Sequence, residues 1–195
     1  MDADATSRFH TENAAIYAAQ SFEPSKALEP FLARLKPGAE ILELGCGNGR
    51  DSAAMMARGF RVTPTDGTPE MAREASSRLG IEVRVLSFAE ISFVPAFDGI
   101  WANACLLHVL RADLGGVLAA IYTALRPGGV FAASFKAGEA EGCDGLGRHY
   151  NYPSRAWLEW LVGTLPWATV EVEGARGSGY DKVATDWLQV TAIRR

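Results

Sequence analysis

ILELGCGNGR, residues 41–50, is the stretch of sequence that decides the fold. A short apolar run, typical of a buried strand, ends in glycines at positions 45, 47 and 49, and a helical segment follows. Glycine permits the positive φ angles and the close backbone approach that a sharp strand-to-helix turn requires. A turn of this kind, with free amides at a helix N-terminus, is typical of nucleotide-binding α/β folds.

Strands and helices alternate on both sides of this turn. Apolar periodicity and turn residues predict helices over 9–21, 26–36, 50–59, 68–80, 111–125 and 154–165, and strands over 39–44, 60–66, 81–88, 97–104, 130–135, 168–174 and 186–195. Such alternation predicts a parallel sheet covered on both faces. The last two strands, joined by ARGSGYDK (175–182), have no helix between them and should be antiparallel. We therefore expect an α/β, Rossmann-like three-layer sandwich with a mostly parallel seven-stranded sheet and an antiparallel last strand.

The bulk composition narrows the function classes. A length of 195 residues suits one domain, and 48% apolar with 22% charged residues is ordinary for a globular protein. The net charge of −4 argues against a nucleic acid or an anionic membrane as partner. No apolar run is long enough for a membrane span, and the acidic residues 1–10 lack the apolar core expected of a signal peptide. Three scattered cysteines form neither a disulfide framework nor a zinc site, so we expect a cytoplasmic protein without a metal.

The glycine turn itself separates two kinds of nucleotide site. A dinucleotide fingerprint needs a third glycine where this chain has Arg50. Glu43 also places a negative charge beside the turn, where it would repel a diphosphate. S-adenosylmethionine carries a sulfonium, an ammonium and one carboxylate but no phosphate, so it suits these residues better.

Four motifs, in order and at natural spacing, resemble those of class I S-adenosylmethionine-dependent methyltransferases of the small, tellurite-resistance-like type. They are ILELGCGNGRD (41–51), the TD of VTPTDGTPEM (62–71), FDGIWANACLLHVL (97–110) and ALRPGGVFAASF (124–135). The resemblance covers most of the chain. It implies a single domain over 1–195, with a helical cap (1–37), a cofactor-binding core (38–135) and an acceptor-side region of loop, helix and hairpin (136–195).

The resemblance also implies a set of cofactor-binding residues. Asp66, at the end of the second strand, would bridge the ribose hydroxyls, although an Asp in this position also caps helices. The implied contacts are Tyr17, Glu43, Gly45, Cys46, Gly47, Arg50, Asp66, Gly67, Ser87, Phe88 and Asn103.

Several of these assignments compete with simpler interpretations. Many relatives have an acid where this chain has Ser87, and Phe88 could equally belong to the core. Arg50 either meets the cofactor carboxylate or is an exposed helical arginine. Tyr17, in a segment that resembles the helix covering the cofactor, either contacts the methionine carboxylate or only packs.

The acceptor side offers fewer signals. Alignment of the acceptor with the methyl group can supply most of the catalysis, so no catalytic dyad is required. His108 is the candidate base, with a buried structural histidine as the competing interpretation. The glycine-rich loop 136–152 carries Arg148, Tyr150 and Tyr152, which we expect to bind an anionic or polar acceptor, unless this is a mobile surface loop.

The sequence thus predicts a methyltransferase that converts S-adenosylmethionine to S-adenosylhomocysteine while methylating a small molecule, as a monomer or a homodimer. The fourth strand lacks the Asn/Asp-Pro-Pro-aromatic motif of amino-methylating relatives, which argues against DNA adenine as acceptor. RNA (tRNA) methylation and a non-catalytic S-adenosylmethionine-binding module remain the alternatives, and a dinucleotide oxidoreductase fits least well.

Overall fold

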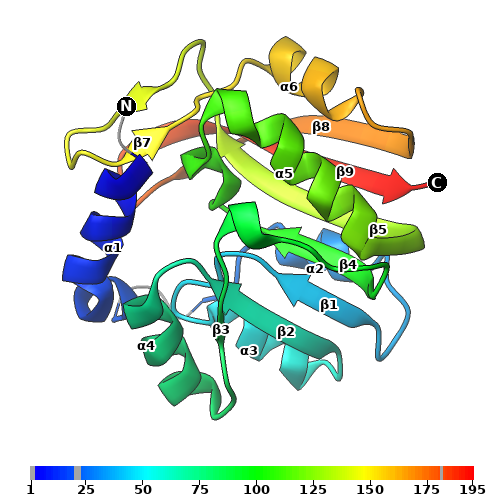
Figure 1. The fold of residues 1–195 in the computed structure, drawn as a ribbon, viewed down its shortest axis with the longest axis horizontal. Helices are drawn as coiled ribbons and strands as arrows, with labels where there is room; N and C mark the ends of the chain where they lie inside the picture. Colours follow the sequence, from blue (N-terminus) through cyan, green and yellow to red (C-terminus); the bar gives the residue numbers. More distant parts are fainter. Residues whose placement is uncertain (1–2, 20–22, 181) are drawn as a thin grey trace.

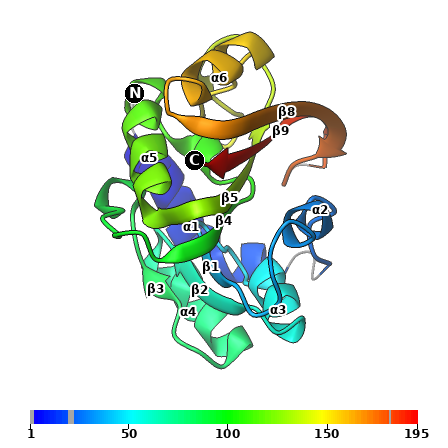
Figure 2. The same cartoon turned by 90° about the vertical axis from the view of Figure 1, so that its right-hand side faces the viewer.

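The computed structural model describes residues 3–19, 23–180 and 182–195. It shows a seven-stranded sheet in the order β3-β2-β1-β4-β5-β9-β8 with helices packed on both faces (Figures 1 and 2). The strands are β1 (Glu40–Glu43), β2 (Arg61–Asp66), β3 (Arg84–Val85), β4 (Phe97–Ala102), β5 (Leu125–Lys136), β8 (Trp167–Ser178) and β9 (Ala184–Arg194). The helices are α1 (Ala3–Ala18), α2 (Leu28–Leu32), α3 (Arg50–Ala57), α4 (Pro69–Leu79), α5 (Arg111–Ala124) and α6 (Arg155–Val162), with 3-10 turns η1 (Phe88–Glu90) and η2 (Leu106–His108).

The direction of the strands follows from how they are connected. The five strands from β3 to β5 pair in parallel, and β9 pairs antiparallel with both β5 and β8. Only residues 179–183 separate β8 from β9, which leaves no room for a crossover helix. The predicted Rossmann-like α/β fold with an antiparallel last strand is confirmed.

The central strands are apolar on both faces because helices cover both faces. Ile41 and Trp101 pack with α2 and α3, whereas the alternate residues Leu42 and Ile100 belong to the larger core beneath α5 and α6. The carboxyl ends of β1, β2, β4 and β5 therefore emerge at one edge of a rigid sheet. Helix α1 lies beside that edge and packs against α4 and β7 (His149–Tyr150) (Figure 1).

Three elements differ in length from the prediction. The N-terminal helix begins at Ala3 and ends at Ala18, and residues 20 and 21 of the predicted helix 9–21 lie outside the described residues. The predicted helix 26–36 shortens to five residues around Pro30, which lacks the amide a longer helix would use. The predicted strand 81–88 shortens to Arg84–Val85, since Ser87 begins a 3-10 turn instead.

Two further differences concern glycine-rich segments. RPGG (126–129), between the predicted helix 111–125 and the predicted strand 130–135, lies inside β5. The pairing with β4 shifts there between Leu125 and Val130, and Gly128 takes a φ of 79°. The predicted loop 136–152 contains an antiparallel hairpin formed by β6 (Gly142–Cys143) and β7. None of the helices in the described residues combines the length and the apolar character that a membrane span requires.

Candidate active site

The turn after β1 holds three glycines in the left-handed region, with φ angles of 62° at Gly45, 58° at Gly47 and 74° at Gly49. A Cβ atom added at Gly45 would lie 2.5 Å from Cβ of Cys105, so this glycine lets the segment after β4 pack against the turn. A Cβ added at Gly47 would face Cε1 of Tyr17 at 3.7 Å. The space beside Gly45 is thus filled by Cys105, and that beside Gly47 borders the Tyr17 ring, so the approach of a cofactor to either backbone stays a prediction.

Asp66, at the end of β2, is joined to this turn. Its Oδ2 accepts a hydrogen bond from the amide of Gly47 at 3.0 Å, and its Oδ1 accepts one from the amide of Thr68 at 2.9 Å. The side chain is buried, and burial raises the pKa of its carboxyl group. The turn is tied to β2 a second time, because the amide of the buried Cys46 donates to the carbonyl of Thr65 at 2.8 Å. Asp66 thus bonds both the glycine turn and Thr68, the N-cap residue of α4.

Two more buried acids lie beside the turn. Glu43 ends β1 and accepts a hydrogen bond from the hydroxyl of Ser52. Burial, followed by the negative charge of Asp51, raises the pKa of Glu43 well above its usual value. Glu43, Asp51 and Asp66 therefore form a group of three acids, each at most 8% exposed. The positive charge of Arg50 partly offsets this rise in the pKa of Glu43.

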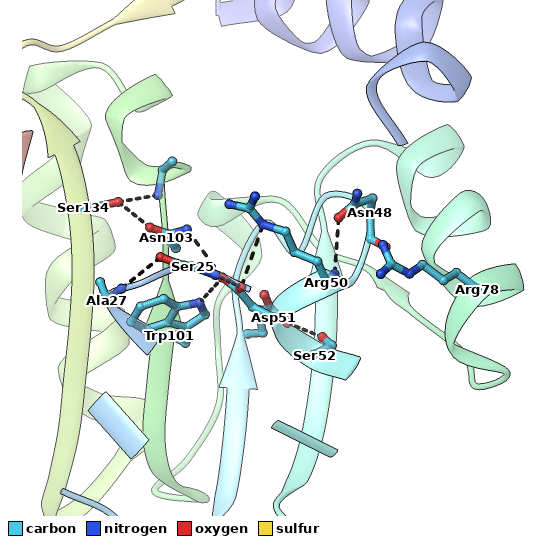
Figure 3. Close-up of polar contacts among 12 residues, drawn as sticks. Ser25, Ala27, Asn48, Arg50, Asp51, Ser52, Arg78, Trp101, Asn103 and Ser134 are labelled. Atoms are coloured by element: carbon cyan, nitrogen blue, oxygen red, sulfur yellow. Dashed lines mark hydrogen bonds and ion pairs between the residues drawn. The ribbon is translucent and has the colours of Figure 1, made fainter. Parts of the chain in front are cut away.

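Asp51 organises the residues around it (Figure 3). Its Oδ1 accepts from the amide of Ser25 at 2.7 Å, and its Oδ2 accepts from Nε1 of Trp101 at 3.0 Å and from Nδ2 of Asn103 at 3.5 Å. These bonds connect the first turn of α3 with β4 and with the segment before α2. The sequence analysis missed Asp51, because an acid in the first turn of a helix is common and its partners lie 26 to 52 residues away.

Asn103, which follows β4, makes its side-chain contacts within the protein. Its Nδ2 donates to Asp51 and its Oδ1 accepts from the hydroxyl of Ser134 at 2.7 Å, which in turn accepts from the amide of Ala104 at 2.8 Å. Figure 3 shows this chain of bonds running from β5 to α3. Asn103 holds the end of β4 in place, and the contact of its amide with the cofactor stays a prediction.

Arg50 places a partly exposed guanidinium beside the buried acids of the site. Its Nε lies 3.8 Å from Oδ1 of Asp51, and its side chain is 33% exposed. Figure 3 shows the guanidinium pointing away from the helix, over Asp51 and toward Asn103. It is the group that could meet a ligand carboxylate, as one of the two interpretations requires.

The residues expected around an adenine lie on the neighbouring edge. Ser87 caps η1, with its hydroxyl donating to Oε2 of Glu90 at 2.7 Å and its amide bonded to the same oxygen at 3.1 Å. Phe88 is half-buried against the main core, and Gly67 is exposed beside Asp66. The hydroxyl of Ser87 is thus used by a capping box. Its role, like that of Phe88, stays a prediction.

Tyr17 on α1 covers the glycine turn. Its ring stacks on Tyr180, with centroids 5.2 Å apart and planes 4° apart, and lies edge-on to His10 at 5.1 Å. Burial raises the pKa of its hydroxyl, and the charges of Arg50 and Asp66 reach it. Tyr17 therefore lies between the turn and the tip of the β8–β9 hairpin.

His108, in η2, is partly buried beside two aromatic rings. Its Nδ1 lies 2.6 Å from the carbonyl oxygen of His149 and so carries the proton of that hydrogen bond. Its ring contacts Tyr150 at 4.6 Å and His10 at 5.9 Å between centroids. Burial lowers the pKa of His108 to about 3, so the imidazole is neutral and its Nε2 is a hydrogen-bond acceptor.

The guanidinium of Arg148, in contrast to that of Arg50, is buried and bonded to other side chains of the protein. Its Nε and Nη2 both bond Oδ2 of Asp144, at 2.9 and 2.7 Å. Its guanidinium also lies 5.0 to 5.4 Å from the rings of Phe9, Tyr150 and Tyr180, and 2% of the residue is exposed. Direct acceptor binding by Arg148 stays a prediction, but in this structure its charge is balanced by Asp144.

The hairpin that carries Arg148 is bonded to η2 rather than free. The fully buried Asn151 donates from Nδ2 to the carbonyls of Leu106 and Val109, at 2.9 and 3.0 Å. Arg111 at the start of α5 bonds the carbonyls of Asn151 and Tyr152. The rings of Tyr150 and Tyr152 stack, with centroids 5.1 Å apart. The sequence analysis missed Asn151, since no local pattern reveals a buried amide bonded across 42 to 45 residues.

The structure brings the cofactor and acceptor candidates to one edge of the sheet. In the part of the chain that the structure describes, no group of three or more His, Cys, Asp or Glu side chains could hold a metal ion. A glycine turn after β1, an acid at the end of β2 and polar side chains after β4 define a Rossmann-like site for a nucleoside-containing ligand.

Comparison with known proteins shows which family the chain resembles. Residues 41–129 match the family model described as a methyltransferase domain. The chain is 34% identical over 110 residues to the ubiquinone biosynthesis O-methyltransferase of Xanthomonas axonopodis pv. citri, covering 52% of this chain and 45% of that one. It is 31% identical over 160 residues to the trans-aconitate 2-methyltransferase of Azoarcus sp., covering 79% of this chain and 56% of that one. These similarities support a class I S-adenosylmethionine-dependent methyltransferase, with residues 41–129 matching the methyltransferase domain.

A solved structure resembles the whole chain. It is 1,6-didemethyltoxoflavin-N1-methyltransferase of Burkholderia thailandensis, with bound 1,6-didemethyltoxoflavin and S-adenosylhomocysteine. The TM-score is 0.76 at 25% identity, covering 98% of this chain and 88% of that one. By contrast, the chain spans about half the length of the curated relatives named above.

Proposed function

We propose that this protein is an S-adenosylmethionine-dependent methyltransferase that acts on a small-molecule acceptor and leaves S-adenosylhomocysteine as its second product. When bound, the cofactor supplies a methyl group already activated by its sulfonium. The protein must then hold the acceptor in line with that group and exclude water, which can account for much of the rate enhancement.

The observation that carries the proposal is the charge balance around the glycine turn. Glu43, Asp51 and Asp66 are buried together, with Arg50 as their nearby cation. Buried carboxylates require counter-charges, and a ligand with a sulfonium and an ammonium group provides them. A diphosphate would add negative charge to the same place.

Individual residues fit the parts of this cofactor. Each carboxylate oxygen of Asp66 has accepted one amide hydrogen bond and keeps a further acceptor position for the ribose hydroxyls. Arg50 would meet the methionine carboxylate. Tyr17 would close the turn from the side of α1, over Gly47.

A small-molecule acceptor is supported by the relatives. The Azoarcus relative is named for trans-aconitate, and the Burkholderia structure contains 1,6-didemethyltoxoflavin. His108 would contact the acceptor through Nε2. With a pKa of about 3 the ring accepts a hydrogen bond but is a weak base, so we infer that it orients a protonated acceptor. A cytoplasmic location, a single domain over 1–195 and a monomeric or homodimeric state are proposals from the sequence.

Methyl transfer tests the proposal directly. The purified protein is incubated with S-adenosylmethionine and panels of small carboxylic acids, phenols, amines and thiols, and with tRNA, and S-adenosylhomocysteine is quantified. We expect turnover with at least one small-molecule class. Arg50→Met should raise the KM for the cofactor about tenfold, as expected for one charge-assisted contact.

Arg58→Met is the matched control, since Arg58 is an exposed arginine at the other end of α3 that pairs with Glu29. It should leave the KM unchanged. Turnover with tRNA alone would replace the small-molecule acceptor by RNA. Cofactor binding without turnover on any acceptor would indicate a binding module.

A further inference from the structure

Lys136, the last residue of β5, is a largely buried lysine whose ammonium group has no counter-charge among the described residues. The residue is 5% exposed. Across the residues that the structure describes, its Nζ makes neither an ion pair nor a hydrogen bond, and its one recorded contact is the face of the Tyr150 ring, 4.6 Å away. Lysine is almost never buried unless its charge is paired, and an aromatic face replaces a carboxylate only in part. Among the residues that the structure describes, no anion therefore balances the charge of Lys136.

Lys136 lies at the edge of the sheet that holds the candidate active site, so an anion bound to it would lie there. Lys136 lies two residues beyond Ser134 on β5, so both side chains point to the same face of the sheet. Ser134 bonds Asn103, which bonds Asp51 beside the glycine turn. Lys136 is thus the next position along the face that holds the proposed cofactor site, at the carboxyl end of the strand.

The charged and titratable side chains near Lys136 do not balance its positive charge. Arg148 also lies on the Tyr150 ring, at 5.4 Å, but its own charge is matched by Asp144. Burial lowers the pKa of His10 to about 4 and that of His108 to about 3, so both rings are neutral. Within the described ranges, the acceptor side of the edge therefore carries a positive charge without an anionic partner, whereas the cofactor side carries an excess of acid.

We propose that Lys136 binds an anionic group, a carboxylate or a phosphate, on the methyl acceptor. The stacked rings of Tyr150 and Tyr152 lie beside it and offer a flat apolar surface to the rest of that molecule. This assignment rests on the proposed function, and it gives Lys136 the role that the sequence analysis gave to Arg148. The acceptor is then an acid rather than a neutral or cationic molecule.

The test uses three probes of one shape and different charge: benzoate, phenyl phosphate and neutral benzamide. Each is titrated by ligand-observed NMR into the protein loaded with S-adenosylhomocysteine, and thermal unfolding is recorded on the same samples. The variants are Lys136→Met, which keeps the length of the side chain without its charge, and Lys36→Met, which changes an exposed lysine. Lys136→Gln is the second variant should Lys136→Met fail to fold.

Wild type and Lys36→Met should bind benzoate or phenyl phosphate and gain thermal stability from it, with benzamide at least about tenfold weaker. Whichever anion binds more tightly identifies the group. Lys136→Met should lose at least about tenfold in affinity for that anion.

Equal affinity of an anion for Lys136→Met and wild type would overturn the proposal, as would the failure of both anions to bind the wild-type protein. Binding of S-adenosylhomocysteine is measured first, and the probes are also titrated without it. Failure of S-adenosylhomocysteine to bind would contradict the proposed function, while the anion titration would still decide the role of Lys136.

Discussion

At the scale of one residue, Glu43 shows how a binding site can lower the stability of the protein that carries it. Its carboxyl group is buried next to Asp51 and Asp66, and both burial and these charges raise its pKa. The ionised form is thus disfavoured in the folded protein without ligand. A cationic ligand would reverse that preference, so the residue that destabilises the free protein should contribute to binding.

Glu43→Gln should therefore stabilise the ligand-free protein and weaken cofactor binding. Because the folded pKa lies above the unfolded value of 4.5, the unfolding free energy of wild type falls as the pH rises through that interval. The amide introduced by this substitution has no charge to lose and still accepts a hydrogen bond from Ser52. The melting temperature of the variant should exceed that of wild type at pH 8, with a smaller difference at pH 4.5, and its affinity for S-adenosylmethionine should fall about tenfold.

Glu40→Gln is the control for this variant, since Glu40 lies on the same strand but pairs with the exposed Arg61. It should change neither the melting temperature nor the affinity appreciably. A lower melting temperature for Glu43→Gln at pH 8 would contradict the account of Glu43.

At this scale the sequence predicts the site residues that belong to a short local motif. The glycine turn and Asp66 could be predicted because their spacing along the chain is set by one strand, one turn and one helix. Asp51 could not, since its partners Ser25, Trp101 and Asn103 are brought to it by tertiary packing. Asp144, which balances Arg148, lies four residues away in a hairpin that carries no clear hydrophobic pattern.

At the scale of elements, α1, η2 and the β6–β7 hairpin form one junction over the sheet edge. The hydroxyl of Thr6 on α1 accepts from the amide of His149, and His10 on α1 contacts the ring of His108. His108 bonds the carbonyl of His149 on β7. Two neutral histidines therefore hold these three elements together.

This junction should make the protein sensitive to acid. His10 and His108 have folded pKa values of about 4 and about 3, with burial as the main cause and the charge of Arg148 lowering both further, against 6.5 when unfolded. Below pH 6.5 the unfolded chain binds protons that the folded chain excludes, so stability falls as the pH drops toward 4. The slope should approach about 1.4 kcal/mol per pH unit for each histidine.

Urea unfolding of the ligand-free protein between pH 4.5 and pH 7.5 measures this slope. His108→Asn, whose amide can still donate to the carbonyl of His149, should lower this slope by about 1.4 kcal/mol per pH unit relative to wild type, since the contribution of Glu43, which has the opposite sign, is the same in both proteins. A slope that is unchanged in the variant would show that His108 is not kept neutral by the fold.

The sequence predicts the alternation of elements because each buried strand and amphipathic helix has its own period. It does not predict the β6–β7 hairpin, whose strands have two residues each and whose bonds run to η2 and α1. Nor does it show that RPGG lies within β5, since the bulge depends on pairing with β4.

At the scale of the whole molecule, negative and positive side chains lie at different places along the functional edge of the sheet. Acids gather at the carboxyl ends of β1 and β2, where a cationic cofactor is proposed, and Lys136 ends β5, where an anionic acceptor is proposed. The overall net charge of −4 gives no sign of this separation. It arises because the parallel strands bring distant residues to one edge.

Calorimetric titration of the purified protein with S-adenosylmethionine and with NAD tests the central claim, that the glycine turn and its acids bind a cationic nucleoside. We predict saturable heat with S-adenosylmethionine and none with NAD. Asp66→Asn should weaken S-adenosylmethionine binding about ten- to a hundredfold, while Asp113→Asn, on the exposed start of α5, should leave it unchanged. Tight binding of NAD with no heat from S-adenosylmethionine, or equal affinity in Asp66→Asn, would contradict the account.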